Sequence, residues 1–349
     1  MPLPTVEELV KARSFQTLTP EQVESFMKRG FLRLPGAIPL DKCDWWAKDV
    51  WHRLGMDPND KSTWTVERSH MPRQNLIPAK DIAPVAWAAI CELLGGEERI
   101  AQGGEMWTDA FIVNHGTDDV EGKTFGPREL DNWHVDGDFF IHFLDSPEQS
   151  LLVIPCWSDV ETNAGATWIC DEGPKRVAQH MFNHPEGLSP MMTHRDDKLK
   201  KFQHDFYHNI IREASEDSFH EMTGNKGDVI LMHPLMLHSA SKNSKRAIRI
   251  ITNPPVSLSE PFQFNRSNPE EYSLVELKTI QDVGGLEKFK DWKITGEREM
   301  FLPARVEQQT KKQALEIERM KKLGLETLKT GGLISQTPNL FEKSQKVAA

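Results

Sequence analysis

Hydrophobic and polar residues alternate in two ways along the chain, and the pattern changes near residue 105. Before this point apolar side chains recur at helical spacing, as at Val23, Phe26 and Met27. The preceding run Thr19-Pro20-Glu21-Gln22 has the capping threonine, the proline and the glutamine expected at a helix start. The same criteria predict helices over 39–55 and 81–94 and one short strand over 31–34.

Between 105 and 256 the apolar residues fall in short runs rich in β-branched and aromatic side chains. Turn residues such as Asn163-Ala164-Gly165 separate most of these runs, which predicts a series of short strands. The stretch 175–222 interrupts the series with histidines and charges, and we expect an insertion there with a helix around 198–214. The predicted strands cover 106–114, 134–144, 149–158, 166–170, 228–232 and 246–253.

Short strands in such a series indicate a barrel or sandwich, and a jelly roll is the variety that encloses a metal site. We therefore predict a mainly β fold with α additions, in which a double-stranded β-helix (jelly-roll) core occupies 105–256. An N-terminal helical region at 1–104 packs on this core. The polar remainder, 257–349, forms an extension with a charged helix over 304–330 and completes one structural unit.

Composition narrows the classes of function. The 349 residues include 42 basic and 52 acidic side chains, a net charge of -10, with no basic block, so nucleic acid is not an expected partner. No apolar run is long enough to cross a membrane, and the N-terminus lacks a secretory signal. The four cysteines lie far apart without a C-x-x-C pair, as in reduced proteins. We expect a cytoplasmic protein that acts on a small molecule.

Three residues have the pattern of a metal site. His134 and Asp136 are two apart in a predicted strand, so their side chains share a face with Cα atoms roughly 6.5–7 Å apart. His238 follows a buried apolar run and could approach from a neighbouring strand. Two histidines and one carboxylate on one face of iron(II) leave three positions open, which is the arrangement of non-haem oxygenases.

Other residues compete for these positions, because a lone H-x-D arises by chance among 13 histidines and 52 acids. Asp138 is an alternative carboxylate, although it lies beyond Gly137, where the strand could bend. His142 shares the parity of His134, and residues of this kind are more often satisfied core histidines. His233 could replace His238, but a proline follows it at once.

The stretch after His238 carries a family resemblance. The chain resembles the phytanoyl-CoA dioxygenase family of iron(II)/2-oxoglutarate oxygenases over roughly 18–256. That family pairs W-H-x-D with a distal H-x-x-x-x-N and an arginine eleven residues after the distal histidine. Where the family often has serine two residues after that histidine, this chain has Ala240. The matching residues here are Trp133, His134, Asp136, His238, Asn243 and Arg249, together with the turn from Asn163 to Thr167.

The resemblance implies the cofactors and the reaction. Iron(II), 2-oxoglutarate and O2 would be used to oxidise a C–H bond of a small organic molecule by hydroxylation, desaturation or cyclisation, with succinate and CO2 formed from 2-oxoglutarate. Arg249 would bind the distal carboxylate of 2-oxoglutarate through two parallel hydrogen bonds, and Thr167 would lie in the same co-substrate site. Asp136 favours oxidation over halogenation, because related halogenases lack this carboxylate.

Two further possibilities and two substrate residues remain open at this point. A non-oxidative cupin-type isomerase or lyase, or a catalytically silent jelly-roll binding protein, would keep the same fold. Cupins usually lack an arginine at the spacing of Arg249. Trp107 and Asn114 flank a strand predicted to line the barrel mouth and are candidate substrate contacts, although such residues more often belong to a core.

Overall fold

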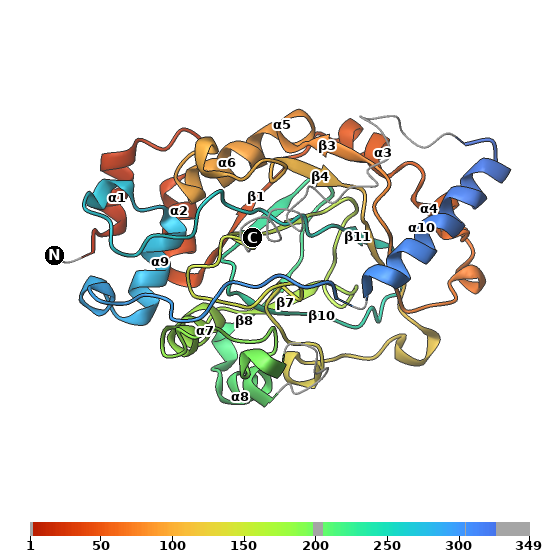
Figure 1. Cartoon of the computed structure of the whole chain (residues 1–349). Coiled ribbons are helices and arrows are strands. Elements are labelled where there is room, and N and C mark those ends of the chain that lie inside the picture. The colour runs from red at the N-terminus through yellow and green to blue at the C-terminus, as the bar shows by residue number, and fades with distance from the viewer. Residues whose placement is uncertain (1–2, 198–204, 304, 326–349) are drawn as a thin grey trace, which may run out of the picture.

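Short strands occupy the middle of the molecule, and helices lie around them (Figure 1). The computed structural model describes residues 3–197, 205–303 and 305–325. The helices are α1 (Val6–Arg13), α2 (Pro20–Arg29), α3 (Leu40–Ala47), α4 (Val50–Leu54), α5 (Ala79–Ile82), α6 (Pro84–Leu94), α7 (Gly173–Phe182), α8 (Asp205–Glu213), α9 (Leu274–Val283) and α10 (Arg305–Lys322). The strands are β1 (Phe31–Leu34), β2 (Arg68–His70), β3 (Leu76–Pro78), β4 (Met106–Thr108), β5 (Ile112–Asn114), β6 (Leu152–Pro155), β7 (Thr167–Cys170), β8 (Phe219–Met222), β9 (Val229–Met232), β10 (Leu237–Ala240) and β11 (Arg249–Ile251).

The N-terminal helices form largely where the apolar spacing predicts them. Thr19 caps α2 through the expected capping box, and Gly30 ends this helix in the left-handed conformation with φ 77°. The helix predicted over 81–94 begins earlier, at Ala79, and is interrupted at Ala83. Pro84 explains the interruption, because a proline disfavours helical geometry in the residue before it. The helix predicted over 39–55 is also divided, into α3 and α4.

The strands pair antiparallel in several small sheets. Their orders are β1-β9-β6, β10-β7-β8 and β11-β5-β2, with β3 and β4 forming a separate pair. A single bridge between Cys156 and Ile251 joins the first sheet to the third, and a bridge between His134 and His238 extends the second. An apolar cluster contains side chains from all three sheets, including Ile154, Ile169 and Ile251. The fold is therefore mixed α/β with small antiparallel sheets.

Some predicted boundaries are wrong. The run 134–144 contains only isolated bridges, because Gly137 turns the chain with φ 120° and packs against the rings of Phe140 and His142. The predicted insertion 175–222 ends in β8, which pairs with β7 and thus belongs to a sheet. The helix predicted over 198–214 appears as α8, and its first part, 198–204, lies outside the described residues.

The region after residue 256 is less uniformly polar than expected. In α9 nine of the ten residues are buried, because this helix packs against α7, α2 and α6. The charged C-terminal helix is α10; residue 304 and residues 326–349 of the prediction lie outside the described ones. The main apolar core includes residues of all three predicted regions, such as Phe26, Trp133 and Phe289. Among the described helices, none has the length and apolar character needed to span a bilayer.

Candidate metal centre

His134, Asp136 and His238 converge at one point of the structure. Asp136 Oδ1 lies 3.4 Å from His134 Nε2 and 3.6 Å from His238 Nε2. One donor atom from each residue lies within 4.8 Å of the others, and no other such group of His, Cys, Asp or Glu occurs in the described ranges. The sequence prediction brought together three residues that the fold also brings together.

The backbone explains how residues a hundred positions apart meet. His134 and His238 face each other as an antiparallel pair, in which each backbone N–H donates to the carbonyl of the other over 3.0 Å. Their imidazole centroids are therefore only 4.4 Å apart. Leu237 and Ser239, on either side of His238 in β10, are both fully buried, which fixes the strand that carries it. The two ring positions thus follow from strand pairing.

Hydrogen bonds set the tautomer of both imidazoles. The Nδ1 of His134 lies 2.7 Å from the carbonyl oxygen of Asn132, and that of His238 lies 2.9 Å from the carbonyl oxygen of Met236. A carbonyl only accepts, so each Nδ1 carries the hydrogen. In the neutral form of each ring, Nε2 then carries the lone pair and faces Asp136, as in metal-binding histidines.

The carboxylate of Asp136 is held in its charged form. Burial alone would raise the pKa of Asp136, but hydrogen bonding and charge from His134 and His238 outweigh it and hold this pKa well below its ordinary value. Burial opposes the charged form of His238 as well, yet its pKa is raised because Asp136 faces it. Asn253 Nδ2 donates to Asp136 Oδ2 over 3.3 Å, which leaves Oδ1 toward the imidazoles.

These three residues suit a divalent metal ion. Octahedral bonds of roughly 2.1 Å at right angles place neighbouring donors about 3 Å apart, close to the distances seen here. The donor set of two imidazole nitrogens and one carboxylate oxygen is that of non-haem iron(II) sites. A cation between them would also replace the proton that the facing carboxylate and imidazoles otherwise share.

The alternative ligands are bound elsewhere. Asp138 forms a two-pronged ion pair with Arg305, with both N–O distances at 2.6 Å. His142 Nε2 donates to the Gly137 carbonyl over 2.7 Å, and burial lowers its pKa to about 4. His233 is fully buried and hydrogen-bonds Thr279 over 2.9 Å.

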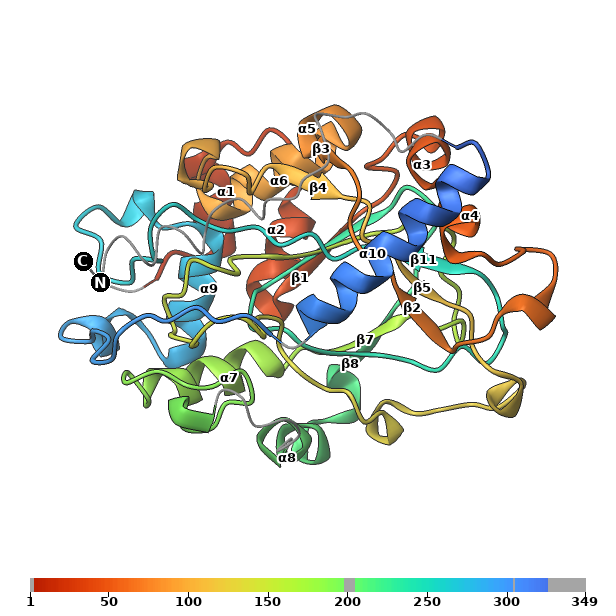
Figure 2. The ribbon, with the colours of Figure 1, turned by 45° about the vertical axis from the view of Figure 1, so that its right-hand side comes forward.

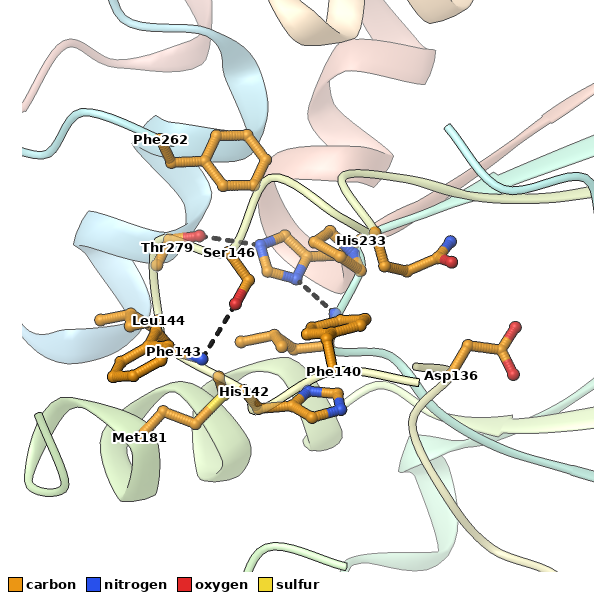
Figure 3. Close-up of a pocket in the computed structure, with 13 residues that line it drawn as sticks. Asp136, Phe140, His142, Phe143, Leu144, Ser146, Met181, His233, Phe262 and Thr279 are labelled. Carbon is orange, nitrogen blue, oxygen red and sulfur yellow. Dashed lines mark hydrogen bonds between the residues drawn. The ribbon is translucent and has the colours of Figure 1, made fainter. Parts of the chain in front are cut away.

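A narrow pocket adjoins the site from behind. His142 and His233 line it together with Phe140 and Thr279. Figure 3 shows Asp136 at one end of this pocket, with its carboxylate pointing away from the other labelled side chains. The two competing histidines therefore lie on the opposite side of Asp136 from its charged group.

Arg249 is a buried cation near the strand turn at Gly165. Only 1 % of the residue is exposed, and its Nε and Nη1 donate to the carbonyls of Gly165 and Ile112 over 2.7 and 3.3 Å. It forms no ion pair within the described residues. Burial first, and then the charge of Arg68, lower the pKa of Arg249 to about 9. A buried guanidinium of this kind needs an anion, and a carboxylate meets it with two parallel hydrogen bonds.

The remaining predicted residues lie on three different strands. Thr167 is buried and pairs with Ala240 in the sheet, so it shares a face with His238. Asn114 lies opposite Arg249 in the sheet, and its Nδ2 donates a hydrogen bond to the carbonyl of Ser241 over 3.1 Å. Trp107 is different: it is buried in the main core and meets the ring of Trp157 edge-on. Substrate contacts at Trp107 and Asn114 stay predictions.

Sequence reasoning missed several residues that shape the site. Asn253 orients Asp136, but it lies outside the family pattern and had no signal in the sequence. Arg68 lies in β2, a three-residue strand within a region predicted to be helical. Asn243, which was matched only by resemblance, ties the loop before Arg249 to β5 through a 2.9 Å bond to the Asn114 carbonyl.

Two imidazoles and one carboxylate, as His134, Asp136 and His238 offer here, are the donor set that non-haem iron enzymes use. The sequence profile of the phytanoyl-CoA dioxygenase family matches residues 26–251, which is more than half of the chain. The chain therefore belongs to the phytanoyl-CoA dioxygenase family, and it is a non-haem iron enzyme that depends on 2-oxoglutarate and O2. No protein with curated annotation matches the chain.

Solved structures with a similar course of the chain are distant. The carbocyclase SnoK from nogalamycin biosynthesis is 13% identical, with a TM-score of 0.40 and coverage of 74% of this chain and 87% of SnoK. EvdO2 from Micromonospora carbonacea var. aurantiaca is 15% identical, with a TM-score of 0.40 and coverage of 74% and 98%. HygX from Streptomyces hygroscopicus, with nickel and 2-oxoglutarate bound, is 12% identical, with a TM-score of 0.38 and coverage of 70% and 90%.

Proposed function

We propose that the chain is an iron(II)/2-oxoglutarate-dependent dioxygenase that oxidises a C–H bond of a small organic molecule. His134, Asp136 and His238 would hold the iron, and Arg249 would hold the distal carboxylate of 2-oxoglutarate. Bound iron supplies the activation of dioxygen that is coupled to conversion of 2-oxoglutarate into succinate and CO2. The observation that carries the proposal is that the buried Arg249, which donates to the carbonyl of Gly165 just before β7, forms no ion pair with any residue that the structure describes.

The fold belongs to the same proposal. We infer that the strands facing each other across the apolar cluster of Ile154, Ile169 and Ile251 form a jelly-roll core over 105–256. The bridges that extend the small sheets support this reading, because they link β6 to β11 and His134 to β10. The regions 1–104 and 257–349 would then cover this core as parts of one unit.

The residues of the chain have separate tasks in this proposal. The carbonyls of Asn132 and Met236 keep both imidazoles in the metal-binding tautomer, and Asn253 fixes the carboxylate of Asp136. Thr167, beside Ala240, would offer a hydroxyl to the co-substrate in place of the serine that the family often has after the distal histidine.

Arg249 also separates the oxygenase from a non-oxidative metal barrel. A cupin-type isomerase or lyase has no dicarboxylate co-substrate, so a buried guanidinium without a counterion would only destabilise its fold. An oxygenase gains the missing anion each time 2-oxoglutarate binds.

Succinate release from 2-oxoglutarate tests the proposal. Purified protein loaded with iron(II) is expected to form succinate slowly even without its own substrate, and His238→Gln is expected to abolish this turnover. His142→Gln is the matched control, because His142 is a buried histidine near the site whose Nε2 donates a hydrogen bond to the Gly137 carbonyl. Wild-type protein that neither turns over nor binds 2-oxoglutarate would support a silent binding protein instead.

A further inference from the structure

A row of side chains in the third sheet contains, besides Arg249, a second arginine for which the described part of the chain provides no ion-pair partner. Arg68, Asn114 and Arg249 are direct partners across β2, β5 and β11. Directly opposed residues of an antiparallel sheet project to the same face, and two strand spacings place the Cα atoms of the two arginines roughly 10 Å apart. Arg68 therefore lies on the face on which Arg249 is buried.

Arg68 has no partner of its own. Its guanidinium forms neither a hydrogen bond nor an ion pair with any described residue, and the residue is only partly exposed. Its charge acts on Arg249, whose pKa it helps to lower. Repulsion between the half-buried Arg68 and the buried Arg249 indicates that no described side chain supplies an anion to either of them.

Other cations lie around the same point. Desolvation, then Arg68, Lys312, Arg249 and Arg305 in that order, lower the pKa of His70 to about 4. Of these cations only Arg305 has a carboxylate partner within the described residues, Asp138. His70 itself is two residues after Arg68 and on the same face of β2.

The C-terminal helix α10 contains two of these cations, Arg305 and Lys312. In Figure 2 α10 crosses the molecule beside β2, β5 and β11, and Gln309 Nε2 donates to the His70 carbonyl over 3.4 Å. The pKa of Arg305, at the start of α10, is raised mainly by its hydrogen bond with Asp138 and to a smaller extent by the charges of Asp138 and Asp136. The positive groups thus extend from the metal centre to the exposed edge strand β2.

One co-substrate cannot neutralise this charge. If 2-oxoglutarate binds as proposed, its free carboxylate satisfies Arg249 and leaves the half-buried Arg68 without a counterion, while Lys312 is exposed to solvent. We propose that Arg68 binds a carboxylate of the substrate that is oxidised, with Lys312 adding long-range attraction. The substrate is then an organic acid, anchored by its carboxylate so that a C–H bond elsewhere in the molecule lies beside the metal. This proposal rests on the function proposed above.

A binding experiment on the preformed complex tests the proposal. Full-length protein loaded with manganese(II) and N-oxalylglycine, an unreactive analogue of 2-oxoglutarate, is titrated calorimetrically with benzoate, benzamide or inorganic phosphate. We expect benzoate to bind and neutral benzamide not to bind. Arg68→Gln is expected to weaken benzoate binding by about 10- to 100-fold, since a charge-assisted pair of hydrogen bonds is lost, and Arg68→Lys is expected to restore part of it.

Controls separate the two proposals. Arg29→Gln removes an exposed arginine at the end of α2, on another element, and is expected to bind benzoate like the wild type. Binding of N-oxalylglycine is measured in the wild type and in every variant. If the wild type does not bind it, the proposed function is contradicted. If only Arg68→Gln fails to bind it, Arg68 belongs to the co-substrate site and the proposed role in substrate binding is overturned. Equal benzoate binding by wild type and Arg68→Gln, no benzoate binding by the wild-type complex, or preference for phosphate would each overturn the assignment of a carboxylate.

Discussion

Replacing Arg249 by methionine should separate co-substrate binding from folding. Methionine keeps much of the length of the side chain and is apolar, so the buried site remains filled. The charge and the donors to Gly165 and Ile112 disappear. In the protein without 2-oxoglutarate, this change removes an unpaired buried cation, so the variant is expected to fold although it cannot bind the co-substrate.

The size of the effect on folding follows from the burial of Arg249. Its pKa is lowered to about 9, which at 1.36 kcal/mol per pH unit is a penalty of about 5 kcal/mol on the charged form. Because this is a cation with a depressed pKa, the penalty is complete below pH 9 and is relieved as the pH rises above it. Two carbonyls that lose their donor cost about 1–3 kcal/mol each. The free energy of unfolding of the variant without ligand is thus expected to lie between about 1 kcal/mol below and about 3 kcal/mol above that of the wild type.

Thermal unfolding with and without 2-oxoglutarate measures the other half of the prediction. At a concentration of 100 Kd the ligand stabilises the wild type by about 2.7 kcal/mol. With about 2.1 cal/mol/K per residue over 349 residues, the Tm of the manganese-loaded protein rises by about 4 °C. Arg249→Met is expected to show no rise at the same concentration.

A neighbouring arginine provides the control. Arg246 is also buried, but it pairs with Asp118 and lies 5.5 Å over the ring of Trp64. Arg246→Met is expected to lower the Tm and to keep the rise with 2-oxoglutarate. A full rise of about 4 °C in Arg249→Met would refute the assignment of Arg249 to the co-substrate.

The remaining predictions concern the metal, the pH dependence and the C-terminal helix. Asp136→Ala is expected to lose iron in metal analysis after gel filtration while Asp138→Ala retains it; equal iron in both would point to a different carboxylate. Burial lowers the pKa of His115 to about 4, so the free energy of unfolding falls as the pH falls from about 6.5 to 4. His115→Gln is expected to remove up to about 3 kcal/mol of this decrease, measured by urea unfolding. An unchanged pH dependence in the variant would argue against this role of His115. Glu316→Ala leaves Arg53 without one of its two buried carboxylate partners. It is expected to lower the free energy of unfolding by about 3 kcal/mol and to speed proteolysis within α10. Unchanged protease resistance would mean that this ion pair does not hold the helix in place.

The convergence of the three proposed metal ligands is easier to predict from the sequence than the strands that carry them. His134, Asp136 and His238 were identifiable because residue type and spacing report ligand chemistry directly. The predicted strand around His134 failed, however, since Gly137 and its ring contacts turn the chain, and tertiary contacts of this kind leave no periodic signal. What remains of it are isolated bridges, from His134 to His238, from Phe140 to Met300 and from His142 to Leu188.

Elements without periodicity escaped prediction for a related reason. Strand β2 has three residues, so alternation cannot be recognised, and its Arg68 became visible only through pairing with β5. The buried helix α9 was hidden by its polar side chains: Lys278 and Asp282 are both buried and satisfy each other in an ion pair. Pairing across the fold, and not local composition, decides the burial of these residues.

Anomalous diffraction at the iron edge from crystals soaked anaerobically with iron(II) would locate the bound metal. We expect one peak at roughly 2.1 Å from the Nε2 atoms of His134 and His238 and from Oδ1 of Asp136. A peak beside His142, His233 or Asp138, or no ordered iron in a crystal whose three ligand side chains are free of contacts, would contradict it.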